Sequence, residues 1–188
     1  MIASENLCLW TIERQDLTKN FLWANDMELT RWAGATPMPR SSQDVEQWFR
    51  NLGLDPEKHI FAIKTHQGDY LGNIELRGLD LRCGCAELGI IIGERNAWNK
   101  GYGTEAVRSL CRFGFGELRL HRIFAHTLSN NPRAAHLFTK CGFIHEGTQR
   151  QAYFQNGTYL DIEMWGLLAD EYRPAAPPRD GASSKNKK

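Results

Sequence analysis

Short segments in which apolar and polar residues alternate dominate the first half of the chain, and this spacing predicts strands with one buried face. Such strands are expected at about 7–12, 59–64, 70–77 and 85–92. Helical spacing between the first two predicts one helix after Asp16 and another after Ser41 or Ser42. The last three strands follow one another through short turns and therefore form an antiparallel meander.

The second half of the chain begins with a long helical pattern at 104–118. Its apolar positions are Val107, Leu110, Cys111, Gly114 and Leu118. A strand at 122–128 and a short helix at about 132–141 follow, and Asn131-Pro132 is a helix-start signal. Two last strands, at about 143–154 and 159–168, flank the hairpin signal Asn156-Gly157. The predicted class is α/β (α+β).

A turn with two glycines joins the strand at 85–92 to the helix at 104–118, in the segment Trp98-Asn-Lys-Gly101-Tyr-Gly103-Thr-Glu-Ala106. The first N–H groups of a helix lack intrahelical partners, and the helix dipole adds positive charge there, so phosphate oxygens are favoured. Glycine permits positive φ and close approach of a ligand to the backbone. The segment therefore predicts an anion site, although an ordinary strand-to-helix turn would also use glycines.

Two nucleotide motifs can be compared with this turn. A P-loop requires a lysine after its last glycine, whereas Lys100 precedes Gly101. Gly101-Tyr-Gly103-Thr-Glu-Ala106 does match the dinucleotide fingerprint, but the next strand ends in Ser129-Asn-Asn131 without the acid that should bind a ribose. The P-loop is excluded, and a dinucleotide binder is disfavoured.

Composition limits the range of partners. The chain has 188 residues and a net charge of +1, and no basic patch interleaved with aromatics points to nucleic acid or a membrane. The N-terminus lacks a leader pattern, which predicts a cytoplasmic protein. Five scattered cysteines favour reduced thiols, and Cys83-Gly-Cys85 lacks further ligands, so no metal is expected. One domain at 1–172 and a disordered tail at 173–188 are predicted.

Three separated segments together carry a family resemblance. They are the glycine turn, Asn131-Pro-Arg-Ala-Ala-His-Leu-Phe-Thr-Lys-Cys-Gly-Phe143, and Asn156-Gly-Thr-Tyr-Leu-Asp-Ile-Glu-Met164. With the order of elements, they resemble the GNAT acetyltransferases over about residues 7–168, notably the branch of RimJ, RimL and spermidine acetyltransferases. The resemblance implies the GNAT fold, a mixed and mostly antiparallel sheet of six to seven strands flanked by helices.

The implied activity is direct transfer of an acetyl group from acetyl-CoA to a primary amine, such as a protein N-terminus, a polyamine or an amino sugar. The pyrophosphate would lie on the backbone amides of 99–104, and the pantetheine arm along 87–92. Trp98 stands where relatives commonly carry Gln or Arg. The implied cofactor-binding residues are Ile90, Ile91, Ile92, Trp98, Asn99, Lys100, Gly101, Tyr102, Gly103, Thr104, Asn131 and Phe138.

For each of two residues near these segments, the sequence allows two different roles. Gly89 is either a bulge that separates neighbouring strands and admits the cofactor arm, or a glycine required by packing. Asn131 contacts the cofactor arm in relatives, but a helix cap alone would explain it.

Catalysis requires a neutral amine, and Glu87 is the candidate base, acting directly or through water. A buried setting would raise its pKa usefully, whereas an acid on a solvent face would not. The positions where relatives place a Tyr or Ser acid are Phe138 and Ala134 here, so no general acid is assigned. Glu75, Tyr153 and Asp161 are the candidate acceptor residues.

Two questions stay open at the level of sequence. A non-catalytic acyl-CoA-binding or regulatory protein is the alternative function, because it would keep the cofactor cradle without the acid. A homodimer is plausible if the last hairpin is exposed.

Overall fold

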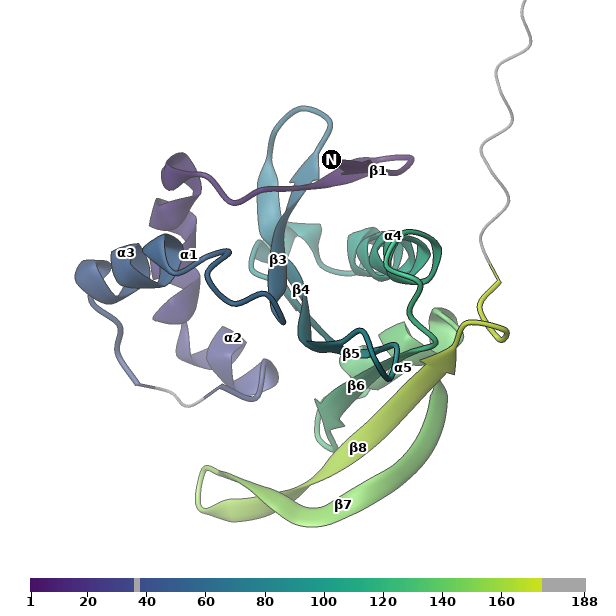
Figure 1. The fold of residues 1–188 in the computed structure, drawn as a ribbon. Coiled ribbons are helices and arrows are strands. Elements are labelled where there is room, and N and C mark those ends of the chain that lie inside the picture. The colour runs from purple at the N-terminus through teal and green to yellow at the C-terminus, as the bar shows by residue number, and fades with distance from the viewer. Residues whose placement is uncertain (36–37, 174–188) are drawn as a thin grey trace, which may run out of the picture.

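One sheet of eight strands organises residues 1–35 and 38–173, which the computed structural model describes (Figure 1). The strand order is β1-β2-β3-β4-β5-β6-β8-β7, and only β5 and β6 run parallel to each other. The strands are β1 Ile2–Ala3, β2 Leu7–Trp10, β3 His59–Thr65, β4 Tyr70–Asp80, β5 Cys85–Ile92, β6 Arg122–Leu128, β7 Ile144–Gln155 and β8 Thr158–Leu168. The mixed sheet is confirmed, with one strand more than expected because β1 is too short to show a pattern.

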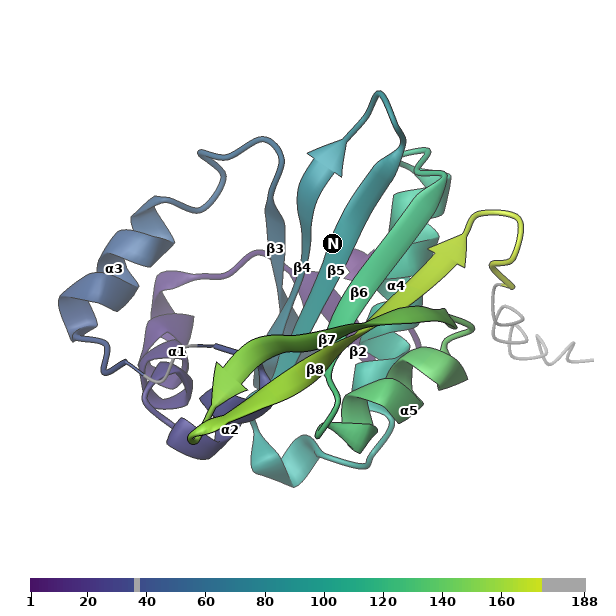
Figure 2. The same cartoon turned by 90° about the horizontal axis from the view of Figure 1, so that it is seen from below.

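Helices lie on both faces of this sheet (Figures 1 and 2). They are α1 Leu17–Ala24, α2 Met27–Trp32, α3 Ser42–Arg50, α4 Tyr102–Gly116 and α5 Pro132–Lys140, with 3₁₀ turns η1 Arg14–Asp16 and η2 Arg95–Ala97. The first three helices occupy one side, and α4 and α5 the other. Helix α2 was not predicted, because six residues are too few for a periodic pattern; Asp26 caps it by accepting from two backbone N–H groups.

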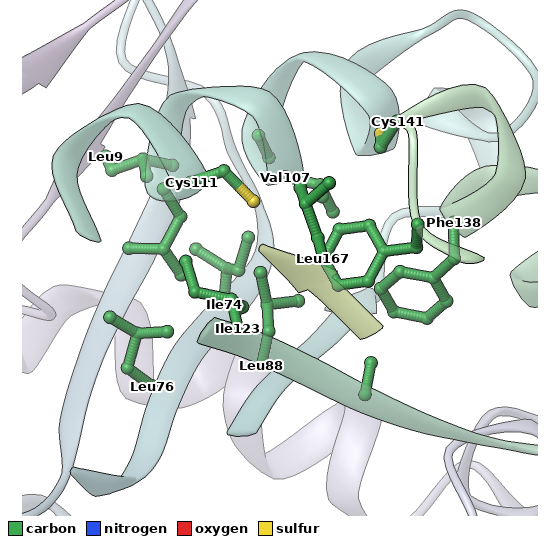
Figure 3. Close-up of a cluster of buried hydrophobic side chains, with 14 of the residues drawn as sticks. Leu9, Ile74, Leu76, Leu88, Val107, Cys111, Ile123, Phe138, Cys141 and Leu167 are labelled. Atoms are coloured by element: carbon green, nitrogen blue, oxygen red, sulfur yellow. The ribbon is translucent and has the colours of Figure 1, made fainter. Parts of the chain in front are cut away.

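The main core fills the space between the sheet and helices α4 and α5 (Figure 3). Of the apolar positions predicted for the long helix, Val107, Leu110, Cys111 and Gly114 are buried, while Leu118 lies beyond the end of α4. They pack against strand residues such as Leu76 and Leu88. Each fully buried aliphatic side chain contributes about 1.5–3 kcal/mol, so α4 is fixed by packing on the sheet.

The parallel pair β5–β6 is short. Its register joins Cys85–Glu87 to Arg122–Phe124 and goes no further. Beyond that point β5 pairs only with β4, and β6 only with β8. The two strands therefore separate in the middle of the sheet, and the backbone of β5 facing β6 has no ladder partner there.

Gly89 lies in the half of β5 that does not pair with β6. The register between β4 and β5 runs through Gly89 without a shift. The bulge interpretation is therefore wrong. A Cβ at Gly89 would lie 3.0 Å from Oε1 of Glu75 on β4. Gly89 is the packing glycine of the second interpretation, because a Cβ there would crowd the Glu75 side chain.

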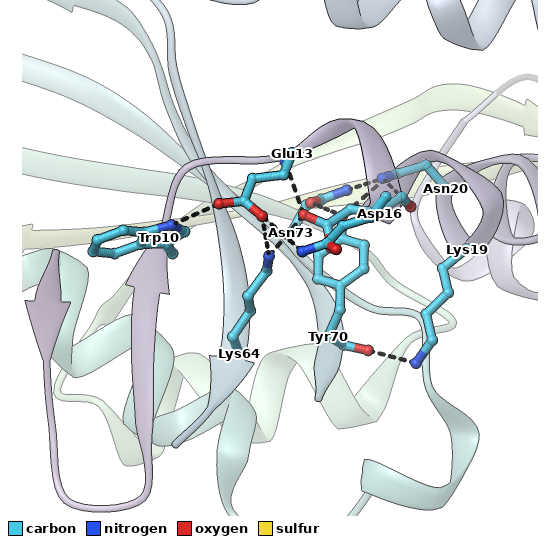
Figure 4. Close-up of polar contacts among 9 residues, drawn as sticks. Trp10, Glu13, Asp16, Lys19, Asn20, Lys64, Tyr70 and Asn73 are labelled. Carbon is cyan, nitrogen blue, oxygen red and sulfur yellow. Dashed lines mark hydrogen bonds and ion pairs between the residues drawn. The ribbon is translucent and has the colours of Figure 1, made fainter. Parts of the chain in front are cut away.

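A buried polar network joins helix α1 to β3 and β4 (Figure 4). Nζ of Lys64 lies 2.8 Å from Oδ2 of Asp16, and both side chains are less than 10% exposed. The Asp16 carboxylate also accepts the Glu13 N–H, and it makes no hydrogen bond to the first N–H groups of α1, which begins directly after Asp16. Asn20 and Tyr70 continue the network toward the middle of the sheet.

One further prediction falls mostly outside the described residues. The tail predicted at 173–188 lies outside them, except for Arg173. Within 1–35 and 38–173, no helix is long and apolar enough to cross a membrane.

Removing the Lys64 charge tests the contribution of the buried pair. Lys64→Met leaves the Asp16 carboxylate buried without its cation, and we expect a loss of about 3–5 kcal/mol in the free energy of unfolding. The double variant Asp16→Asn/Lys64→Met should regain part of that loss, because no charge stays unpaired. Urea titration followed by circular dichroism measures both. Arg50→Met breaks an exposed pair with Glu46 and should cost under about 1 kcal/mol; an equal loss in both single variants would contradict the argument.

Candidate active site

A cavity of about 360 Å³, here called the loop cavity, lies beside the glycine turn. The end of β5, the η2–α4 turn, α5 and the end of α2 form its walls. Most of the predicted cofactor residues line it: Ile90, Ile91, Ile92, Trp98, Asn99, Gly101, Gly103, Thr104 and Asn131. Lys100 and Tyr102 do not, because Tyr102 packs against the main core and Lys100 is exposed.

The glycine turn has a backbone conformation suited to an anion. Gly101 precedes α4 with φ +89°, and Asn99 has φ +60°. No side chain caps α4, and Glu105 is the first residue of the helix whose N–H bonds back, to the Gly101 carbonyl. The N–H groups at the start of α4 are thus open beside the cavity, where the helix dipole favours phosphate.

The indole of Trp98 lies beside two arginines. Its Nε1 donates to the Ile92 carbonyl at 2.8 Å. The guanidinium carbons of Arg95 and Arg133 lie 5.5 and 5.1 Å from the ring centroid. Arg95 is held by Asp26 and by a further carboxylate on α2, whereas no ion pair among the described residues involves Arg133.

Arg133 lines the loop cavity but was not among the site residues predicted from the sequence. Its spacing from Leu137 and Lys140, which also line the cavity, is that of one helix face. That spacing could have pointed to it.

Both polar atoms of the Asn131 side chain form hydrogen bonds within the protein. Its Oδ1 accepts the Ala134 N–H at 3.1 Å, which is the predicted helix cap, and its Nδ2 donates to the Trp32 carbonyl at 3.0 Å. The cap interpretation is confirmed, and Asn131 also ties α5 to the end of α2. Contact with a cofactor arm stays a prediction.

A second cavity, of about 610 Å³, opens where β5 and β6 separate and is here called the gap cavity. It shares six residues with the loop cavity: Trp32, Ala33, Ile90, Ile91, Asn131 and Ala134. The two spaces therefore meet over the unpaired half of β5 and the start of α5.

Glu87 lines the gap cavity at the last position of β5 that pairs with β6. Both carboxylate oxygens accept from Arg77, at 2.9 and 2.6 Å, and Nδ1 of His126 lies 2.9 Å from Oε1. Burial raises the pKa of this carboxyl, but hydrogen bonds from Arg77 and His126 outweigh burial, so the pKa lies below its usual value. Burial would raise the pKa of Glu87 only in the absence of these two partners.

His126 was not among the predicted site residues. Because a carboxylate only accepts, Nδ1 carries the hydrogen in the contact with Glu87, and Nε2 of a neutral ring keeps its lone pair. His126 lies on β6 two residues beyond Phe124, the partner of Glu87. The sequence predicts the strand that carries His126, but it does not show that this strand lies beside β5.

The remaining predicted residues are placed in different regions. Glu75 and Tyr153 line the gap cavity. Asp161 does not line it; its carboxylate accepts the Gln151 N–H at a register shift in the β7–β8 hairpin. Phe138 borders the gap cavity rather than the loop cavity and is a buried core residue that packs edge-to-face against Phe143.

Comparisons with known proteins agree with this arrangement. Residues 6–144 match the family model described as an acetyltransferase (GNAT) domain. An uncharacterised N-acetyltransferase, p20, of Bacillus licheniformis is 32% identical over 91% of this chain and 97% of its own length. Spermidine N(1)-acetyltransferase of Vibrio cholerae is 27% identical over 90% of this chain and 96% of its own length.

A crystal structure of the Vibrio cholerae spermidine N-acetyltransferase in complex with CoA and spermine matches the fold with a TM-score of 0.84. The match has 27% sequence identity and covers 90% of this chain and 99% of that one. The predicted GNAT fold, N-acetyltransferase class and acetyl-CoA cosubstrate are confirmed, and the chain belongs to the GNAT acetyltransferase family.

Proposed function

We propose that the thioester of acetyl-CoA lies where the loop cavity and the gap cavity meet, and that a primary amine reaches it through the gap cavity. The observation that carries the proposal is the shared wall of the two cavities. One contains open helix-start amides, and the other contains a histidine oriented by a carboxylate. Donor and acceptor would thus approach each other from opposite sides of the separated strands.

The cofactor's diphosphate would be held by the amides of 99–104 and by Arg133. The flat Trp98 ring supports the Arg133 guanidinium, which has no carboxylate to neutralise it among the described residues. The pantetheine amides would bond to the free backbone of β5 between Leu88 and Ile92, because β6 has left that edge.

His126 would act as the base, positioned by Glu87. The amine nitrogen forms a bond to the acetyl carbon, its proton moves to Nε2 of His126, and the carbon–sulfur bond breaks to give the CoA thiolate. Glu87, ionised because its pKa is lowered, stabilises the imidazolium that forms. This differs from Glu87 as the direct base, because a carboxylate held by Arg77 is a weak proton acceptor.

The thiolate would leave without a side-chain acid from α5. Phe138 and Ala134 carry no hydroxyl, and Phe138 belongs to the core. A thiolate is only modestly basic, so departure without a proton donor is feasible. A non-catalytic acyl-CoA-binding protein, the alternative function, would bind the cofactor without turnover.

A homodimer and a cytoplasmic location stay predictions. The β7–β8 hairpin does expose Phe154 and Tyr159, at 59% and 65%, which supports an interface. A Vibrio cholerae relative has been solved as a dodecamer.

Replacing His126 tests the base. His126→Gln should lower kcat/KM by about 100-fold or more, because the general base is lost. Glu87→Gln should lower kcat/KM less, because His126 stays in place. The matched control is His145→Gln, which breaks a His–Glu pair outside both cavities and should leave kcat/KM unchanged. Full turnover in His126→Gln would refute the role, and a larger loss in Glu87→Gln would favour Glu87 as the direct base.

Replacing Arg133 tests the diphosphate contact. Arg133→Ala should raise the Kd of CoA and of 3′-dephospho-CoA by the same factor, about tenfold or more, because a charged hydrogen bond is lost. Calorimetry measures both ligands, and Arg50→Ala serves as an exposed control remote from the loop cavity. A loss confined to CoA would instead assign Arg133 to the 3′-phosphate, and unchanged binding of both would remove it from the site.

A further inference from the structure

The charges in the gap cavity restrict the acceptor. Among the described residues that line it, Glu75 and Glu87 are the acids, and Arg77 and His126 are the basic groups. The neighbouring hairpin adds no acid to the lining, because Asp161 lies outside it.

Both carboxylates already have cationic partners. Glu87 is bound by Arg77 and His126. Glu75 has Arg77 at 3.2 Å on one oxygen and Nζ of Lys58 at 3.3 Å on the other. Lys58 is not part of the lining, so it neutralises the cavity from outside. No lining carboxylate is left unpaired for a second ammonium group.

The rest of the lining combines apolar side chains with the neutral polar side chains of Asn73, Thr127, Asn131 and Gln149. Trp32, Trp48 and Tyr153 contribute aromatic rings, and Ile60, Leu128 and Ile162 contribute aliphatic surface. The apolar part of these walls favours an apolar body by burial, and the neutral polar groups offer no opposite charge to an ammonium that loses its water.

We propose, on the basis of the function proposed above, that the acceptor carries a single primary amine on an apolar body and is not a polyamine. The single amine would lie at His126 and Glu87, where it loses its proton. A second ammonium would be placed near Arg77, whose charge repels it, and its only candidate carboxylate, Glu75, is already paired twice. This differs from the spermine complex of the Vibrio cholerae relative.

Hexylamine and 1,6-diaminohexane test the proposal because they share one carbon skeleton. Thiol release from acetyl-CoA gives kcat/KM for each, and the diamine value is halved because it has two reactive ends. We expect hexylamine to be favoured by about tenfold or more. Preference for the diamine, or for spermidine over hexylamine, would overturn the proposal. No thiol release with any of these amines, or with a wider amine panel, despite CoA binding by calorimetry, would instead refute the proposed function itself.

Substituting Lys58 tests whether the ion pairs of Glu75, rather than the size of the cavity, disfavour the diamine. Lys58→Met frees one oxygen of Glu75 and should narrow the preference for the monoamine several-fold, mainly through a lower KM for the diamine. Lys19→Met removes an equally exposed lysine that pairs with Glu94, which is in the lining of neither cavity, and should leave the ratio unchanged. Thermal melting confirms that both variants fold. An unchanged ratio in Lys58→Met would contradict the electrostatic argument.

Discussion

The early end of the parallel pairing between β5 and β6 is the constraint on which the site depends. The two strands pair only as far as Glu87 and Phe124, and beyond that point β5 stays paired with β4 and β6 with β8. The same separation frees backbone groups on β5 and opens the gap cavity. Helix α5, capped by Asn131, closes the other side and joins the two cavities.

Electrostatics at the edge of this gap determine what Glu87 can do. Burial alone would make it a better base, as the sequence suggested, but Arg77 supplies a bidentate partner and His126 a third donor. Charge-assisted hydrogen bonds stabilise the ionised form more than burial disfavours it. In the proposed mechanism the proton-accepting role therefore belongs to His126, whose ring Glu87 orients, and the same pairing leaves the cavity without a free carboxylate.

Trp98 lies on the cofactor side of the site and bears no charge itself. Its ring instead lies against Arg95 and Arg133 and is fixed by a bond to Ile92. A guanidinium that stacks on an aromatic face loses less freedom on binding an anion than one on a free side chain.

The sequence by itself determined the features that depend on neighbours within about one helical turn or one hairpin. The apolar spacing of α4, the glycine turn at Gly101 and the Asn131 cap are local, so their residues could be read directly. Only the tertiary structure decided the chemistry around Glu87, since Arg77, His126 and Glu87 come from three strands whose pairing the sequence does not state. Side chains far apart in the chain meet through strand order and register, and these are set by the packing of the whole sheet.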